Sequence, residues 1–252
     1  MTGAVGEQWG RQVCGRGFVR AAAVLMAVLL TPQMAHAQDA ALTDAQLDEK
    51  FPVTRWEKRI AALEQAAKDN PPPKDCIVFI GSSSIVRWDL KKWFPDLPVV
   101  NHGFGGSHLG DSVHYAERLV IPFRPATVVV YAGDNDLSGG KSPERVFSDY
   151  QKFVAKVQEQ LPETKIIYIA IKPSIRRWAL IDKVRKANAL IAEAAKKDSR
   201  LEYLDVDGPM LGEDDKPRKE LFVQDGLHLS DEGYALWTKL LLAKLAQAQG
   251  KN

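Results

Sequence analysis

The sequence of 252 residues predicts an α/β protein, a parallel β-sheet covered by helices on both faces. Two observations support this prediction. Five short apolar runs, rich in valine, isoleucine and tyrosine, alternate with longer segments whose apolar residues recur at helical spacing. No internal repeat or low-complexity tract interrupts the alternation. Right-handed βαβ units in one three-layer domain are therefore the simplest organisation.

The first expected strand covers residues 76–80 and runs into Gly81 and three serines. Proline-rich residues 70–75 separate it from the preceding helix. Residues 38–55 are polar and are expected to be irregular. Further strands are expected at 98–101, 126–132, 165–171 and 201–206. Helices are expected at 56–68, 109–119, 143–161, 180–197 and 232–246.

Residues 1–37 have the features of a secretory signal peptide. Three arginines precede an apolar run at residues 21–30, and Ala35-His36-Ala37 matches a small-x-small cleavage site. As a helix this run would span about 15 Å, half of a hydrocarbon core, so no stable membrane anchor is expected. We predict cleavage after Ala37 and export to the periplasm or the medium. An N-terminal helix and linker would then cover 38–75, and the main domain 76–250.

Composition narrows the possible partners. Hydrophobic residues make up 45% and charged residues 26% of the chain, as in ordinary globular proteins. Beyond residue 37 the chain holds 31 basic and 31 acidic residues, so no basic excess favours nucleic acid. Cys76 is then the one cysteine, which excludes an intramolecular disulfide and fits a small core residue. The oligomeric state is not indicated.

Polar residues cluster where the expected strands end. They lie in residues 81–84, 101–107 and 133–136, and in residues 225–230 after the last strand. The carboxyl ends of parallel strands share one edge of the sheet, where open α/β folds place their chemistry. A serine there can act as a nucleophile if a base takes its proton and donors hold the oxyanion.

These four segments resemble the sequence blocks of the SGNH, or GDSL-type, ester hydrolases. They occur in the family's order, from Ile77 to about Gly233, and so span nearly all of the chain beyond the signal. The resemblance implies a flavodoxin-like three-layer α/β/α sandwich with a five-stranded parallel sheet, and the hydrolysis of carboxylic esters. It also implies a triad of Ser83, Asp225 and His228, with Gly106 and Asn135 as oxyanion donors.

The chemistry of these residue types fits those roles. A serine hydroxyl needs a base in hydrogen-bond contact, and His228 is the obvious one. Asp225, three residues earlier, can accept the proton on the far imidazole nitrogen and fix the tautomer. The backbone N–H groups of Ser83 and Gly106 and the amide of Asn135 would supply three oxyanion donors. Losing one such donor typically costs about 2.7–4 kcal/mol of barrier.

The chain departs from the family pattern just before the nucleophile, where Ser82 stands in place of the usual aspartate. Three consecutive serines therefore compete on sequence alone, and Ser83 is favoured by its position after Gly81. Ser84 is then a candidate cap for a helix that starts near Ile85. The alternative is that all three serines are turn and cap residues.

The segment after the fourth expected strand, residues 172–178, carries candidates for substrate binding. It resembles a Pro-Ser-x-x-Arg-Trp segment of family members similar to platelet-activating-factor acetylhydrolases and carbohydrate O-acetyl esterases. Arg176 or Arg177 would meet an anionic part of a substrate, and Trp178 a sugar or acyl face. The alternative is a solvated arginine and a packing tryptophan.

Ser82 and Asp134 are further candidates for substrate contact. The histidines His102, His108 and His114 are spaced six apart, which does not place them on one helical face as metal ligands. We expect them to be surface or substrate-contact residues. No metal ion and no organic cofactor is predicted.

The sequence thus predicts an exported serine esterase that cleaves a small-molecule or glycan ester through an acyl-enzyme. Short acyl groups such as acetyl are favoured, because no long apolar insertion is present to build a lid or an acyl tunnel. Two alternatives remain open. The same residues would serve an acyltransferase acting on a carbohydrate or peptidoglycan hydroxyl, and the domain would also suit a non-catalytic carbohydrate-binding protein.

Overall fold

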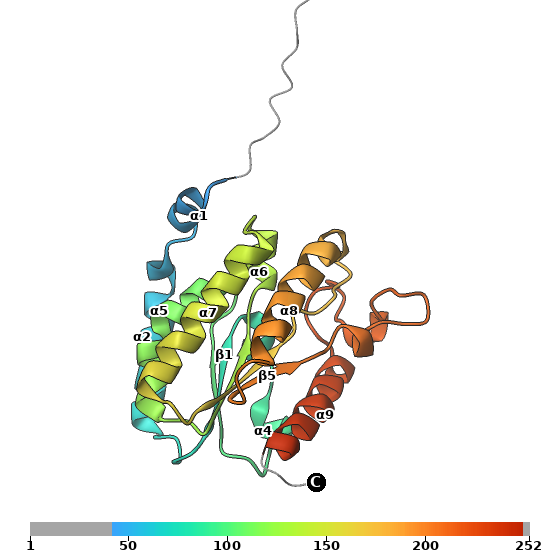
Figure 1. The fold of residues 1–252 in the computed structure, drawn as a ribbon. Helices are drawn as coiled ribbons and strands as arrows, with labels where there is room; N and C mark the ends of the chain where they lie inside the picture. The colour runs from blue at the N-terminus through green and yellow to red at the C-terminus, as the bar shows by residue number, and fades with distance from the viewer. Residues whose placement is uncertain (1–41, 249–252) are drawn as a thin grey trace, which may run out of the picture. The chain divides into compact units, whose positions relative to one another are not determined.

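The computed structural model describes residues 42–248, which lie within one compact unit (Figure 1). In these residues five parallel strands form one sheet in the order β2-β1-β3-β4-β5. The predicted α/β fold with a five-stranded parallel sheet is confirmed. The strands are β1 Ile77–Gly81, β2 Val99–Gly103, β3 Thr127–Tyr131, β4 Lys165–Ile169 and β5 Leu201–Leu204.

Helices connect and flank the strands. The α-helices are α1 Asp44–Lys50, α2 Glu57–Asp69, α3 Ser83–Val86, α4 Leu90–Trp93, α5 Leu109–Leu119, α6 Asp134–Ser138, α7 Pro143–Gln160, α8 Ile181–Ala195 and α9 Asp231–Ala248. Single 3₁₀ turns are η1 Val53–Trp56, η2 Ile121–Phe123, η3 Trp178–Leu180, η4 Gly208–Met210 and η5 Lys219–Leu221. The five long helices expected from periodicity are all present, with ends shifted by at most two residues.

Both faces of the sheet are buried, because successive side chains of a strand point to opposite sides. Val78 and Ile80 of β1 belong to the core shared with α2, α5, α7 and α8. Ile77 and Phe79 belong to the other core, shared with α3, α4 and α9. Figure 1 shows α7 and α8 side by side in front of the sheet. Cys76, just before β1, is fully buried, as a core residue should be.

The order of the strands creates a switch point beside β1. The chain passes from β1 to its neighbour β2 and then returns to the other side of β1 as β3. Gly81, the last residue of β1, is in register with Gly103 of β2 and Tyr131 of β3, so the three strands end together. Because the connections diverge between β1 and β3, their carboxyl ends border the crevice where such sheets bind ligands.

The N-terminal segment, residues 43–56, differs from the expectation of irregular structure. It contains α1 and η1. Thr43 and Gln46 form a capping box, with the Gln46 N–H donating to Thr43 Oγ1 at 3.3 Å and the Thr43 N–H donating to Gln46 Oε1 at 2.9 Å. Leu47 is the one buried residue of α1. The expectation of irregular structure, which was based on the polar composition, was wrong here because a helix with one buried position leaves no apolar stripe in the sequence.

Ion pairs attach the N-terminal segment to the main domain. Arg145 of α7 pairs with Asp44 at 3.2 Å and with Asp48 at 2.9 Å. Arg55 pairs with the buried Asp111 of α5 at 2.6 Å. The segment is therefore part of the domain's packing.

The predicted signal peptide and its cleavage site lie outside the described residues. Within residues 42–248, no helix is long and apolar enough to cross a membrane.

Candidate active site

Four segments bring the predicted site residues to the carboxyl edge of the sheet. β1 runs into α3, which begins with Ser83, and β3 runs into α6, which carries Asn135. The loop between β2 and α5 carries Gly106, and the turn before α9 carries Asp225 and His228. Residues far apart in the sequence therefore lie at the same edge of the sheet.

Ser83 is placed by a sharp turn at the end of β1. Gly81 has a φ of +138°, and a Cβ on it would collide with the carbonyl oxygen of Tyr131, so glycine is required. Ser82 donates its backbone N–H to that same oxygen at 2.9 Å. The turn ends the strand and makes Ser83 the first residue of α3, with its side chain partly exposed.

His228 connects Ser83 to Asp225 through hydrogen bonds. Nε2 of His228 lies 3.0 Å from Oγ of Ser83, and Nδ1 lies 2.6 Å from Oδ2 of Asp225. Because an ionised carboxylate only accepts hydrogen bonds, the imidazole proton sits on Nδ1 and the Nε2 lone pair faces the serine. This tautomer can take the proton of the Ser83 hydroxyl.

Asp225 is held by the backbone as well as by the imidazole. Its Oδ1 accepts the N–H of Leu227 at 2.8 Å and the N–H of His228 at 2.9 Å. Burial alone would raise the carboxyl pKa, but the hydrogen bonds from the His228 ring and from the two N–H groups outweigh burial and lower the pKa. Asp225 is therefore ionised at neutral pH, as an orienting carboxylate must be.

The turn that carries Asp225 and His228 is closed on itself and tied to a neighbouring segment. The Val223 N–H donates to the carbonyl of His228, and the Gly226 N–H donates to the carbonyl of Val223, both at 2.9 Å. The Arg176 N–H, from the segment after β4, donates to the carbonyl of Gly226 at 3.0 Å. The position of the imidazole is thus set from two parts of the chain.

The three predicted oxyanion donors lie on neighbouring segments. No hydrogen bond within residues 42–248 occupies the backbone N–H of Ser83, at the start of α3, or that of Gly106. Gly106 has a φ of +82°, in the left-handed region that favours glycine. Asn135 Nδ2 donates one N–H to the carbonyl of Ser107 at 3.0 Å, which joins α6 to the loop of Gly106. Its other N–H remains for a further acceptor.

The three consecutive serines differ in burial and in their contacts. Ser82 and Ser84 are each 1% exposed, while Ser83 is the one in contact with His228. Ser84 does not cap a helix near Ile85 as expected, because α3 begins two residues earlier and Ser82 occupies the cap position. The hydroxyl of Ser84 instead accepts a hydrogen bond from Lys172 at 3.3 Å. Ser82, a candidate for substrate contact, is buried in the turn that precedes Ser83.

A buried group of charged and polar side chains lies next to Ser83 and Ser84. Lys172 is 1% exposed at its side chain, and its Nζ donates to the Tyr131 hydroxyl at 2.8 Å and to Asp134 at 3.2 Å. Burial lowers the pKa of Lys172. Burial raises the pKa of Asp134, but the charges of Lys172 and Arg177 outweigh it, so that pKa is lowered. Lys172 was not predicted from the sequence as a site residue. Its position just after β4, at the carboxyl edge of the sheet, was the only sequence feature that could have indicated it.

The segment after β4 places its two arginines differently. Arg176 is exposed, whereas Arg177 points at protein groups. Nη1 of Arg177 lies 3.0 Å from Oδ2 of Asp134, and Nη2 donates to Oδ1 of Asn135 at 3.0 Å. Trp178 is partly exposed, with the Lys216 ammonium 4.7 Å from its ring centroid. Asp134, proposed from sequence to contact substrate, is instead buried in this ionic group.

Two of the three histidines in the second loop region are buried, which corrects the expectation of surface positions. His102 is 2% exposed and has Nδ1 2.6 Å from the carbonyl oxygen of Leu119. His108 is 4% exposed and precedes α5, while His114 is exposed. Within residues 42–248, no group of three or more histidine, cysteine, aspartate or glutamate side chains is arranged to hold a metal ion.

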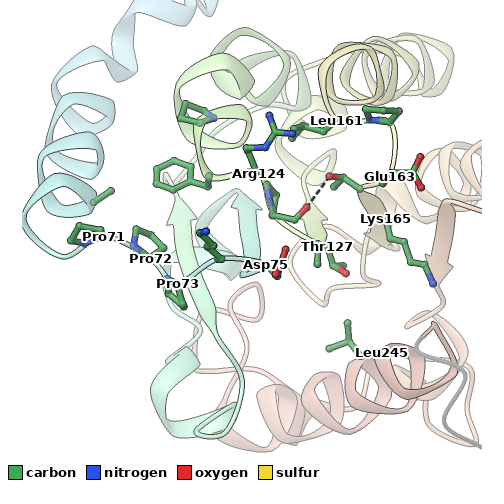
Figure 2. Close-up of a pocket in the computed structure, with 18 residues that line it drawn as sticks. Pro71, Pro72, Pro73, Asp75, Arg124, Thr127, Leu161, Glu163, Lys165 and Leu245 are labelled. Atoms are coloured by element: carbon green, nitrogen blue, oxygen red, sulfur yellow. Dashed lines mark hydrogen bonds between the residues drawn. The ribbon is translucent and has the colours of Figure 1, made fainter.

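A cavity lies at the opposite end of the strands from Ser83. Its volume is about 1030 Å³, and its walls come from residues 71–75, 122–127 and 161–165 (Figure 2). Among the described residues that line it there is no serine, cysteine or histidine. A second cavity of about 530 Å³ lies between the N-terminal segment and helices α5 and α7. Neither is lined by Ser83 or His228.

Solved structures with this fold include ester hydrolases. A putative platelet activating factor protein from Streptococcus pneumoniae is 21% identical over 80% of this chain and 97% of its own, with a TM-score of 0.69. A carbohydrate esterase of family 3 from Talaromyces cellulolyticus is 16% identical over 68% and 97%, with a TM-score of 0.56. An acetylxylan esterase from Geobacillus stearothermophilus is 15% identical over 68% and 94%, with the same TM-score of 0.56. These similarities support the fold.

The sequence itself matches a family model. Comparison with curated proteins gives no match. The model of the GDSL-like lipase/acylhydrolase family matches residues 81–236, from the last residue of β1 into α9. The matched region covers more than half of the chain and contains every residue of the site described above. The chain belongs to the GDSL-like lipase/acylhydrolase family and is an ester-cleaving hydrolase.

Proposed function

We propose that this protein is an exported serine esterase that removes short acyl groups, of the acetyl type, from carbohydrate or small-molecule esters. The observation that supports it most is the hydrogen-bonded series from Ser83 Oγ through His228 to Asp225. A nucleophile, its base and the orienting acid are in contact, with an asparagine amide on the neighbouring segment.

In the first half of the reaction, Ser83 Oγ attacks the ester carbonyl carbon while His228 Nε2 takes the hydroxyl proton. The carbonyl oxygen becomes an oxyanion, which the N–H groups of Ser83 and Gly106 and the amide of Asn135 stabilise. The bond to the alcohol oxygen then breaks, and His228 returns its proton to that oxygen. The alcohol leaves, and the acyl group remains as an ester of Ser83.

Water completes the reaction by the same route. His228 Nε2 takes a proton from a water molecule, and the hydroxyl attacks the acyl-enzyme carbonyl. The same three donors hold the second oxyanion. The bond to Ser83 Oγ breaks, the serine recovers its proton from His228, and the carboxylic acid leaves. Throughout both halves Asp225 stays ionised and stabilises the imidazolium.

Two features support a short acyl group and a sugar-like alcohol. Neither of the two cavities described above is lined by Ser83, and the sequence has no long apolar insertion to build an acyl tunnel. Trp178 offers a partly exposed ring on the segment that is bonded to the catalytic turn, and such rings stack on sugar faces. Acetyl removal from a glycan would match the name of the acetylxylan esterase from Geobacillus stearothermophilus, which has this fold.

Export is the second part of the proposal, and it depends on residues 1–37. The measurement is the N-terminal sequence and mass of the protein recovered from periplasm and medium. A chain that begins at Gln38 is expected. A full-length protein confined to the cytosol would refute export without affecting the esterase assignment.

The esterase is tested by the hydrolysis of p-nitrophenyl acetate, butyrate and octanoate, with the full chain and the chain from Gln38. The rate should fall as the acyl chain lengthens, and Ser83→Ala should abolish it. Asp225→Asn should lower kcat about 10⁴-fold, because the wrong tautomer of His228 is then favoured. Ser82→Ala and Ser84→Ala are the matched controls. Loss of activity in one of these, with Ser83→Ala active, would identify another nucleophile.

Inactivity of the folded wild-type protein on all three esters would contradict hydrolysis. Product analysis with added carbohydrate acceptors then distinguishes acyl transfer from binding alone. Acetylated xylan and acetylated peptidoglycan fragments, assayed by release of acetate, would identify the alcohol half of the substrate.

A further inference from the structure

Arg177, in the segment after β4, contacts helix α6. Its guanidinium joins two residues of α6 at once, with Nη1 3.0 Å from Asp134 Oδ2 and Nη2 3.0 Å from Asn135 Oδ1. The side chain is 19% exposed, so most of it is packed away from solvent. Among the described residues, the amide of Asn135 is therefore hydrogen-bonded at both of its ends, to Arg177 and to Ser107.

These two partners leave only one orientation for the amide of Asn135. A guanidinium can only donate hydrogen bonds, so it must face Oδ1. A backbone carbonyl can only accept, so the carbonyl of Ser107 must face Nδ2. Turning the amide over would set two donors against each other and two acceptors against each other. The second N–H of Nδ2 is consequently directed away from both partners.

The guanidinium is itself held in place. Asp134 is buried, forms an ion pair with Arg177 and accepts a hydrogen bond from Lys172, and its carboxylate is kept ionised by their two charges. Moving Arg177 toward a substrate anion would give up its pairing with this buried carboxylate. Because a planar guanidinium can make two separate contacts in a fixed geometry, it can hold Asp134 and Asn135 together.

From this arrangement we propose that Arg177 is a positioning residue for the oxyanion hole, which acts on the reaction through Asn135 and does not bind an anionic group of the substrate. This rests on the proposed function, in which Asn135 donates to the oxyanion. Arg177 holds the amide so that the free N–H of Nδ2 faces the developing negative charge. The positive charge of the guanidinium, which faces Oδ1 of Asn135, also polarises the amide and strengthens the hydrogen bond from Nδ2.

The test is a double-mutant cycle in the full chain, with p-nitrophenyl acetate as an uncharged substrate. Asn135→Ala should lower kcat about 10²- to 10³-fold. Arg177→Met should lower kcat roughly tenfold or more and change KM less than about threefold. The reason is that the Arg177 side chain is proposed to act, through Asn135, only on the transition state. In the Asn135→Ala background, Arg177→Met should lower kcat further by no more than about a factor of two.

Two further variants separate positioning from folding. Arg177→Lys keeps a positive charge beside Asp134 but lacks the fork that reaches Asn135, so it should fold normally and keep the low kcat. Arg200→Met removes an arginine that pairs with Asp198 at 2.7 Å before β5, at the other end of the strands, and should leave kcat unchanged. Thermal unfolding of every variant is recorded beside the kinetics.

The outcomes are distinct. Additive losses in the double variant, a wild-type kcat in Arg177→Lys, or an effect confined to KM would overturn the positioning role while leaving the esterase intact. Full activity in Ser83→Ala or in Asn135→Ala would overturn the proposed function and this inference together. A kcat loss that disappears in the Asn135→Ala background supports the positioning role.

Discussion

The indole ring of Trp56 covers Gly106, the backbone donor proposed for the oxyanion. A Cβ on Gly106 would lie 3.4 Å from Cη2 of Trp56. The indole is fixed by its Nε1–H, which donates to Oδ2 of Asp111 at 3.0 Å, and that same oxygen accepts the N–H of His108 at 2.7 Å. The N-terminal segment thus contacts the loop that would hold the oxyanion.

Replacing Trp56 by alanine should loosen the Gly106 loop and lower kcat roughly tenfold, with a small change in KM, since the donor is then less preorganised. Steady-state kinetics on p-nitrophenyl acetate measures both constants. Trp56→Phe keeps a ring over Gly106 but loses the bond to Asp111, and should fall between wild type and Trp56→Ala. Wild-type kcat in Trp56→Ala would show that the ring does not position the loop.

Replacing Lys172 by methionine should destabilise the fold by about 3 kcal/mol, because the buried Asp134 carboxylate loses one of its two cations. Urea unfolding followed by tryptophan fluorescence measures the change. The matched control is Lys244→Met, which breaks a partly exposed pair with Glu202 and should cost less than about 1 kcal/mol. An equal loss in free energy of unfolding in Lys172→Met and Lys244→Met would mean that burial does not make the Lys172–Asp134 pair more important for stability than the Lys244–Glu202 pair.

Replacing Gly81 by alanine should cost more than about 3 kcal/mol, since the residue has positive φ and its new Cβ would meet the Tyr131 carbonyl. The comparison is Gly208→Ala, where no atom lies within 4 Å of the added Cβ and a change below about 1 kcal/mol is expected. Thermal unfolding gives both values. A Gly81→Ala protein as stable as Gly208→Ala would contradict the geometry of the turn.

Stability should fall in mild acid because of His108. Burial lowers its pKa to about 4, against 6.5 for an exposed histidine. Between these pH values the unfolded state takes up a proton that the folded state does not, so stability rises with pH across this range. The difference corresponds to about 3 kcal/mol. His108→Asn, which does not titrate, should flatten part of this slope in urea titrations from pH 4 to 7.5. An unchanged slope would exclude His108 as the cause.

The fold could be predicted because its signals are local. The inner strands β1, β3 and β4 are short apolar runs buried on both faces, as Val78 and Phe79 show in opposite cores, and the long helices have apolar stripes. The register that aligns Gly81 with Gly103 and Tyr131 depends on packing between distant segments and left no local pattern. The helix α1 was missed because the capping pair Thr43 and Gln46 was its main signal.

The site was predicted residue by residue from motif order, and the structure brings Ser83, His228 and Asp225 into contact. The direction in which a side chain points could not be predicted from the sequence. Arg177 and Arg176 are neighbours in the chain, yet one contacts Asp134 and Asn135 and the other faces solvent. The burial of His102 and His108 likewise follows from how α5 packs on the sheet.

The separation of the site residues along the chain has a consequence for biosynthesis. Ser83 lies 145 positions before the histidine that would activate it, and Asp48 lies 97 positions before its partner Arg145. Ser83 of a growing chain is therefore made long before His228, and contacts between such distant segments form late in folding. Hydrolysis should begin only after translation has passed residue 228 and α9 has packed against the sheet, so a chain that ends before His228 should be inactive.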